Sequence, residues 1–208
     1  MLPELDQADA IFQRLSVDDK FNLDFMEPFS HVLYVKEDRS RLSFLAHNAV
    51  NIDKYRSETC LIVGNFYSLR SDHEKAITYF KRALRLNPNN ATTWILLGHE
   101  YLEMKTINTA IEAYRRAIGS FPAVAAINYP FPQLRTFPSM SVDTNPRDYR
   151  AWYGLGQGYE LLKMPFYTLY YYQKATSLRP YDTRIWGALG KSYEEQQRFH
   201  DAIKCYER

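Results

Sequence analysis

The chain has 208 residues, of which 46% are hydrophobic and 24% charged, and its formal net charge is +2. These are ordinary globular values, and the near-neutral balance lacks the strong basic stripe expected of a nucleic-acid partner. No stretch reaches the roughly 18 apolar residues of a membrane span, and the acidic start MLPELDQADA is unlike a signal peptide. The two cysteines, Cys60 and Cys205, form no CxxC pair, so we expect reduced thiols and an intracellular protein of the nucleus and cytoplasm.

A spacing of 34 residues recurs along the chain. Glycines at 64, 98, 156 and 190 are separated by 34, 58 and 34 residues. When each glycine is numbered position 8 of a unit, other residue types repeat in the same register. Position 4 holds Cys60, Trp94, Trp152 and Trp186, position 11 holds Tyr67, Tyr101, Tyr159 and Tyr193, and position 24 holds Phe80, Tyr114, Tyr172 and Tyr206. This register resembles the tetratricopeptide repeat, a pair of antiparallel helices, here termed A and B.

The register divides the whole chain, and the predicted fold class is all-α, a tetratricopeptide-repeat superhelix. In chain order the predicted parts are the lone helix B of a truncated repeat (1–22), a degenerate repeat in which Ser30 replaces the glycine (23–56), two repeats (57–90 and 91–118), a proline-rich inserted loop (119–142), a linker (143–148), a further repeat (149–182) and a truncated repeat (183–208). Neither end resembles the polar capping helix that normally closes a solenoid. We therefore interpret the chain as a fragment of a longer array, cut at both ends.

Residue size explains the register. Glycine at position 8 and a small residue at position 20 let helices A and B of one unit approach closely. Large residues at positions 4, 7, 11 and 24 fill the surrounding space, and each contributes roughly 1.5–3 kcal/mol when fully buried. The residue before position 1 is a good helix N-cap in three units (Asn90, Asp148 and Asp182) and is Arg56 in the fourth.

The inserted loop interrupts an otherwise continuous register. Removing 119–142 joins Ile118 to Asp143 and places Pro146 at position 32 of the preceding unit. Four of the chain's ten prolines lie in this segment, which predicts extended or polyproline-like chain rather than helix. The segment is interpreted as a variable loop, a docking peptide or a retained non-coding segment.

No catalytic, metal or cofactor site is legible. The glycines of Gly154-Leu-Gly156-Gln-Gly158 fall inside a predicted helix A, whereas a phosphate-binding loop must follow a strand and open a helix. The histidines are scattered without metal-ligand spacing, and no catalytic triad is apparent. We therefore expect no enzyme activity, no metal and no cofactor.

The remaining candidate for a functional site is the concave groove that A helices line in this architecture. Positions 2, 5, 9 and 12 are expected to face it. The predicted peptide-groove residues are Asn65, His99, Arg150, Tyr153, Gln157, Arg184 and Lys191, with Ser68, Ile95, Glu160 and Glu194 beside them. Amides, aromatics and mixed charges suit the binding of an extended peptide. The alternative is that these residues are only the solvated surface of a spacer.

Three strings resemble one family more specifically: LSFLAHNAVNIDKYRSETCLIVGNFYSLRSDHEKAITYFKRALRLNP, TWILLGHEYLEMKTINTAIEAYRRAI and RDYRAWYGLGQGYELLKMPFYTLYYYQKA. They are similar to subunit eight of the anaphase-promoting complex, the cell division cycle protein 23 type. The resemblance implies a non-catalytic scaffold of a ubiquitin ligase that drives mitotic exit. It also implies partners among other subunits and co-activator peptides, and homodimers of the full-length family members. Nucleic acid and membrane are not expected as partners.

A second hypothesis is a tetratricopeptide adaptor such as a co-chaperone that binds a C-terminal peptide. Its carboxylate clamp requires lysine or arginine at positions 2, 5 and 6 with asparagine at position 9. Position 5 holds Leu61, Ile95, Tyr153 and Gly187, and only Asn65 supplies the amide. A third hypothesis is a regulatory domain severed from an enzyme. Recovery of ubiquitin-ligase subunits or of chaperones in a pull-down distinguishes the first two.

Overall fold

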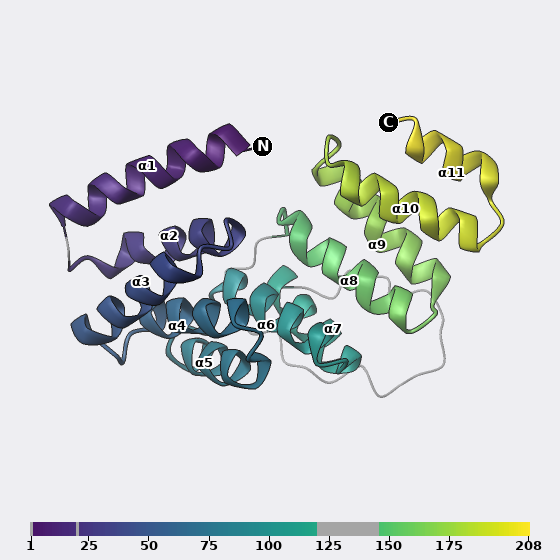
Figure 1. Cartoon of the computed structure of the whole chain (residues 1–208). Helices are drawn as coiled ribbons and strands as arrows, with labels where there is room; N and C mark the ends of the chain where they lie inside the picture. The colour runs from purple at the N-terminus through teal and green to yellow at the C-terminus, as the bar shows by residue number, and fades with distance from the viewer. Residues whose placement is uncertain (1, 20, 120–145) are drawn as a thin grey trace. The chain divides into compact units, whose positions relative to one another are not determined.

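The computed structural model describes residues 2–19, 21–119 and 146–208, and all regular structure within these ranges is helical. The helices fall into two compact units, Met1–Pro88 and Asn89–Arg208 (Figure 1). The first unit contains α1 (Leu2–Asp18), α2 (Leu23–Val35), α3 (Arg39–Ile52), α4 (Ser57–Leu69) and α5 (His73–Leu86). The second contains α6 (Ala91–Glu103), α7 (Ile107–Ile118), α8 (Tyr149–Leu161), α9 (Pro165–Leu178), α10 (Thr183–Glu195) and α11 (Phe199–Tyr206). The predicted all-α fold class is confirmed.

The contact between helices A and B has the predicted form. A Cβ atom built on Gly64 would lie 2.4 Å from the ring of Phe80, and one on Gly156 would lie 2.3 Å from the ring of Tyr172. The same relation joins Gly98 to Tyr114 and Gly190 to Tyr206. Because any side chain at position 8 would overlap the position-24 ring, glycine is required wherever that ring is present.

The predicted N-caps are also observed. The side chains of Asn90, Asp148 and Asp182 each accept a hydrogen bond from a backbone N–H in the first turn of their helix. Arg56, before α4, makes no side-chain cap. A cap of this kind stabilises a helix by about 1 kcal/mol, so α6, α8 and α10 begin at residues that the sequence specifies.

The turn from helix A to helix B has one geometry in all five pairs. Its position-15 residue adopts a left-handed backbone with φ between 56° and 61°, at Glu37, Ser71, Lys105, Lys163 and Gln197. The next residue donates its N–H to the carbonyl of position 11 in each pair, for example Met164 to Tyr159 at 3.0 Å. This closes the end of helix A with a pattern that often uses glycine. None of the five residues is glycine, so this conformation could not be predicted from residue type.

Helix α8 has glycines on two faces, and each face packs closely against a neighbouring helix. Gly156 faces Tyr172 of its own pair, but Gly154 and Gly158 face the preceding helix α7. Cβ atoms built on them would lie 2.5 Å from the ring of Tyr114 and 2.9 Å from Ile111. The three glycines of this helix therefore allow close packing toward both α9 and α7, and they lie inside a helix, where a phosphate-binding loop is not formed.

The chain enters α8 and α10 in the same way. The Trp152 indole N–H donates to the carbonyl of Pro146 at 2.9 Å, and the Trp186 indole N–H donates to the carbonyl of Pro180 at 2.7 Å. Pro146 thus occupies the structural place of a position-32 proline, as the register predicts. Before the insertion, α7 has 12 residues where α5 and α9 have 14, and it ends at Gly119, whose φ is 75°. The rest of the predicted inserted loop lies outside the described residues.

Candidate protein-interaction surface

The seven predicted groove residues divide between the two units, and Asn65 is the one in the first. Its side chain is completely buried, and its amide nitrogen donates to the hydroxyl of Ser30 on α2 at 2.9 Å. The Ser30 hydroxyl in turn donates to the carbonyl of Glu27 at 2.7 Å. Asn65 therefore connects two repeats inside the unit, and the expectation that its amide faces a groove is not met.

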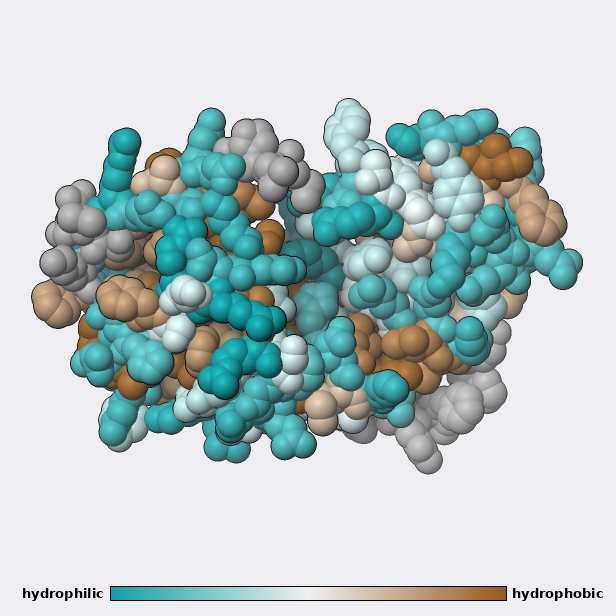
Figure 2. Space-filling model, in the orientation of Figure 1, coloured by the Kyte–Doolittle hydropathy of each residue, from teal (hydrophilic) through white to brown (hydrophobic). Residues whose placement is uncertain are grey.

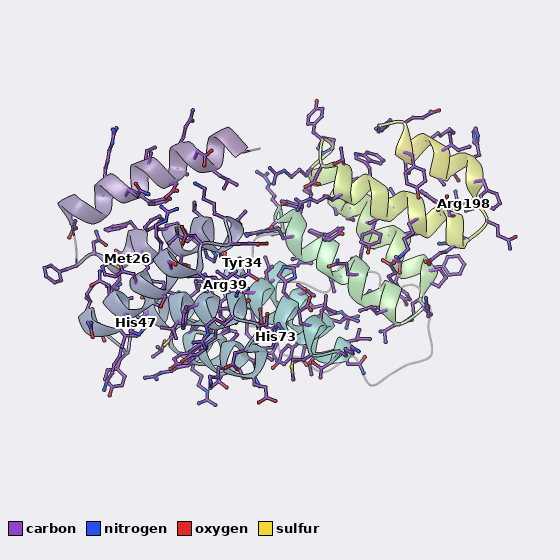
Figure 3. The ribbon with its side chains drawn as sticks, viewed as in Figure 1. Met26, Tyr34, Arg39, His47, His73 and Arg198 are labelled. Atoms are coloured by element: carbon purple, nitrogen blue, oxygen red, sulfur yellow. The ribbon has the colours of Figure 1, made fainter. Side chains whose placement is uncertain are left out.

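The surroundings of Asn65 are polar. Tyr34 on α2, which Figure 3 labels, places its hydroxyl 3.1 Å from that of Ser68 on α4. The Asn65 Oδ1 atom is buried and receives no hydrogen bond from the described residues. Sequence analysis missed this cluster because its members are about one repeat apart, and only the shared register of α2 and α4 relates them.

In the second unit, His99 also points inward. Its Nδ1 atom lies 2.8 Å from the hydroxyl of Tyr114, and the two rings meet edge to face at 5.5 Å. Burial, reinforced by the nearby Arg150 cation, lowers the pKa of His99 to about 4. Burial raises the pKa of Tyr114. At neutral pH His99 is therefore an uncharged partner of a core tyrosine.

Two exposed arginines, Arg150 and Arg184, stand at equivalent places on successive A helices. Arg150 binds the N-cap Asp148 with Nη2–Oδ2 and Nε–Oδ1 distances of 2.6 and 3.0 Å. Arg184 binds the N-cap Asp182 with corresponding distances of 2.9 and 3.1 Å. The hydrogen bond from Arg184 holds the pKa of Asp182 below its usual range. Each N-cap carboxylate thus both caps its helix and orients a guanidinium, and the arginine side chains are 44% exposed at Arg150 and 65% exposed at Arg184.

Tyr153 and Lys191 are linked through Tyr172 and Glu160. The ring of Tyr153 lies 5.4 Å from that of Tyr172, and burial raises the pKa of Tyr153. Lys191 binds Glu160 with an Nζ–Oε1 distance of 2.8 Å, and the Tyr172 hydroxyl donates to Glu160 Oε2 at 2.7 Å. Glu160 therefore links the surface lysine to the buried tyrosine that packs on Gly156.

Gln157 lies near the middle of α8 and is partly buried. Its side chain forms no hydrogen bond with another described residue. Its amide is therefore available to an external partner, unlike that of Asn65.

A pocket of about 180 Å³ adjoins Glu160, between the start of α9 and the end of α10. Its lining residues are Glu160, Lys163, Met164, Pro165, Thr168, Ser192, Glu195 and Gln196. Hydrophobic surface gathers near the end of α8 (Figure 2), where Leu161 and Phe166 are 55% and 77% exposed. The surface of the second unit thus combines two oriented arginines, a half-buried tyrosine, a paired lysine, a small pocket and exposed apolar side chains.

Exposed cations, an aromatic ring and a side-chain amide are groups that can bind an extended peptide. Among residues 2–19, 21–119 and 146–208, no three histidine, cysteine or acidic side chains gather as metal ligands would. None of the described helices has the length and hydropathy needed to cross a bilayer. Cys60 and Cys205 are buried free thiols, and burial raises the pKa of both.

Comparison with known proteins defines the class. Family models described as tetratricopeptide repeat match residues 58–90, 91–123 and 183–208. A solved chain titled as the APC/C hetero-tetramer Cut9-Hcn1 superposes with a TM-score of 0.78 at 18% identity, over 98% of this chain and 34% of that one. MamA superposes with a TM-score of 0.64 at 21% identity, over 82% and 90% of the two chains. The chain therefore has the tetratricopeptide-repeat fold.

Curated relatives narrow the class. The chain is 49% identical over 104 residues to anaphase-promoting complex subunit 8 of Arabidopsis thaliana, which covers 50% of this chain and 18% of the relative. It is 48% identical over 105 residues to the Dictyostelium discoideum subunit 8, and 42% identical over 105 residues to subunit CDC23 of Saccharomyces cerevisiae, with coverage of 50% of this chain and 18% and 17% of the relatives. The resemblance found in the sequence is confirmed. The chain spans less than a fifth of the length of these relatives.

Proposed function

We propose that this chain is a non-catalytic scaffold segment of an anaphase-promoting complex and contributes to cell-cycle control in the nucleus and cytoplasm. The observation that carries the proposal is the identity of 42–49% to proteins named as subunit 8 or CDC23 of that complex, over half of this chain. Identity at this level, far above the 17–21% of the solved tetratricopeptide structures, supports a shared role rather than only a shared fold.

The partners in this proposal are other subunits of the complex and short peptides of co-activators. Full-length relatives would also pair as homodimers. Arg184, Tyr153 and Gln157 support a peptide site on the second unit, because they offer an oriented cation, an aromatic face and an unused amide. An extended peptide can be held by its backbone through such an amide and anchored by one side chain.

Affinity purification of the tagged full chain from dividing cells tests the scaffold role. We expect recovery of other subunits of the ubiquitin ligase at levels that follow the bait. Recovery of chaperones without ligase subunits would contradict the proposal and favour the co-chaperone alternative. That alternative has little support at position 5, since Leu61 and Ile95 are buried and apolar where a clamp requires cations.

A pair of substitutions tests the peptide site separately. Gln157→Ala with Arg184→Ala should weaken capture of co-activator peptides at least tenfold, while the free energy of unfolding changes by less than about 1 kcal/mol, because both side chains lie outside the core. Arg116→Ala is the matched control, since this arginine forms an exposed ion pair with Glu112 on helix B. Equal loss of peptide capture in the control would refute the site.

A further inference from the structure

Helix α1 is attached to the rest of the first unit through a buried carboxylate. The side chain of Asp9 is only 8% exposed. Arg41 donates two hydrogen bonds to this carboxylate, from Nη1 to Oδ1 at 2.9 Å and from Nη2 to Oδ2 at 3.0 Å. Lys36 donates from Nζ to Oδ2 at 2.6 Å. A bidentate arginine–carboxylate pair of this kind is both strong and geometrically specific.

The two cations belong to the turn between α2 and α3, and this turn holds them in place. Lys36 is the C-cap of α2, and Asp38 is the N-cap of α3. Asp38 accepts hydrogen bonds from the backbone N–H of Arg41 at 3.0 Å and from its Nε atom at 2.6 Å. The guanidinium therefore presents its remaining N–H groups to Asp9 from a fixed position.

Among the described side chains of α1, one further acidic residue and one aromatic residue also contact α2 or the residue that ends it. Asp6 binds Lys36 at 2.7 Å, and the ring of Phe12 stacks on that of Phe29 of α2 with centroids 5.5 Å apart. Asp6, Asp9 and Phe12 are spaced by three residues and so share one face of the helix. Figure 1 shows α1 lying along α2.

The attachment of α1 differs from that of the helices beneath it. A buried cluster of the first unit consists of side chains from α2, α3 and α4, and among the described side chains of α1 it is Phe12 that packs against this cluster. On the opposite face of α1, Ile11 is 57% exposed. Removal of one partner of a buried ion pair leaves the other charge uncompensated. A helix bound at this place therefore needs carboxylates opposite Lys36 and Arg41.

We propose that the surface formed by Lys36, Arg41 and Phe29 is a docking site for an acidic amphipathic helix with the pattern Asp-x-x-Asp-x-x-Phe. Helix α1 is its resident occupant, and a partner helix with the same pattern takes its place when α1 is released. The charge complementarity between two fixed cations and two carboxylates one helical turn apart, together with the ring stack, specifies this occupant over a purely apolar helix.

Binding of a labelled peptide to the full chain tests the proposal. The probe is the α1 sequence LPELDQADAIFQRLSVD, followed by fluorescence anisotropy. An Asp9→Asn chain should bind the probe at least tenfold more tightly than the unaltered chain, because its own α1 competes less well. A second probe carries the Asp9→Asn substitution itself. It should bind the Asp9→Asn chain at least tenfold more weakly than the unaltered probe does. Equal binding of the probe to both chains, or equal affinity of the two probes, would overturn the proposal.

Hydrogen exchange on the full chain provides a second test. Asp9→Asn should accelerate exchange of α1 amides at least tenfold and leave α2–α5 protection within twofold. Asp19→Asn is the matched control, because it removes a carboxylate charge next to α1 and Asp19 forms no ion pair with another described residue. This change should leave the exchange rates of α1 and of α2–α5 unaltered. If the Asp9→Asn chain does not fold, exchange in the unaltered chain decides the question. Exchange of α1 before α2–α5 supports a releasable occupant, and exchange of all five in one step contradicts it.

Discussion

The pairs α2–α3 and α8–α9 solve one packing problem with opposite distributions of volume. In α8–α9, position 8 is Gly156 and position 24 is Tyr172, whose ring fills the space where a Cβ would lie. In α2–α3, position 8 is Ser30 and position 24 is Ala46, and both are buried. Helix B of α2–α3 thus has a smaller side chain at position 24 than helix B of α8–α9, and the larger residue at position 8 of helix A makes up part of the difference in volume.

This exchange has a chemical consequence. The Tyr172 hydroxyl donates to Glu160 within its own pair, whereas the Ser30 hydroxyl accepts from Asn65 of the following repeat. In α8–α9 the larger residue of the two lies on helix B, and its hydroxyl bonds within the repeat. In α2–α3 the larger residue lies on helix A, and its hydroxyl also bonds to the following repeat.

The largest expected effect comes from placing the serine and alanine of α2–α3 at positions 8 and 24 of α8–α9. Tyr172→Ala should lower the free energy of unfolding by about 3–5 kcal/mol through the cavity it leaves, and Gly156→Ser should cost about 1–3 kcal/mol through overlap with the ring. The double variant should lose less than the sum, because it recreates the Ser–Ala combination of α2–α3. Urea denaturation of the four chains measures the coupling, and strictly additive losses would contradict the comparison.

A third arrangement is found at Tyr114, whose hydroxyl meets His99. The folded pKa of His99 is about 4, below the 6.5 of an unfolded histidine. Below pH 6.5 the unfolded state binds the proton first, so stability present at neutral pH is lost as the pH falls toward 4. The loss attributable to His99 should approach about 3 kcal/mol. Stability measured from pH 7 to 4 should decline less steeply in His99→Gln, and parallel profiles would contradict this assignment.

The contact between repeats in the first unit should be worth less. Asn65→Ala and Ser30→Ala should each cost about 1–2 kcal/mol, since each removes one member of a buried hydrogen bond. The double variant should cost little more than either single change, because both remove the same bond. Gln157→Ala should change stability by less than about 0.5 kcal/mol. Thermal unfolding of the four variants makes the comparison, and an Asn65→Ala chain of unchanged stability would place that amide outside the core.

A small, stabilising effect is expected for removal of 119–142. The chain already enters α8 through Pro146 and Asp148 as it enters α10 through Pro180 and Asp182. A shorter connection should therefore leave the helical content unchanged and stabilise the second unit by about 1 kcal/mol through reduced loop-closure entropy. Circular dichroism and thermal unfolding test this expectation. A chain that loses its α7–α8 packing on deletion would show that the segment has a structural role.

The sequence predicted those features that depend on position within one repeat. The glycine–aromatic contacts, the three N-caps and the place of Pro146 all follow from local register. The partners of Asn65 and Asp9 could not be predicted, because each bonds to a residue about one repeat away and its type alone suggests an exposed surface. Gly154 and Gly158 were similarly ambiguous, since only the packing of α7 against α8 shows what they make room for.

The left-handed turns between helices A and B have a consequence for engineering. A non-glycine residue in this conformation costs about 1 kcal/mol relative to glycine. The chain bears that cost once in each of five pairs, at Glu37, Ser71, Lys105, Lys163 and Gln197. In an array where each repeat contacts only its neighbours, gains at separate turns add nearly independently. Each substitution by glycine at these five sites would thus raise the unfolding temperature further. None of them alters the arginines, the tyrosine or the amide through which the protein is proposed to bind its partners.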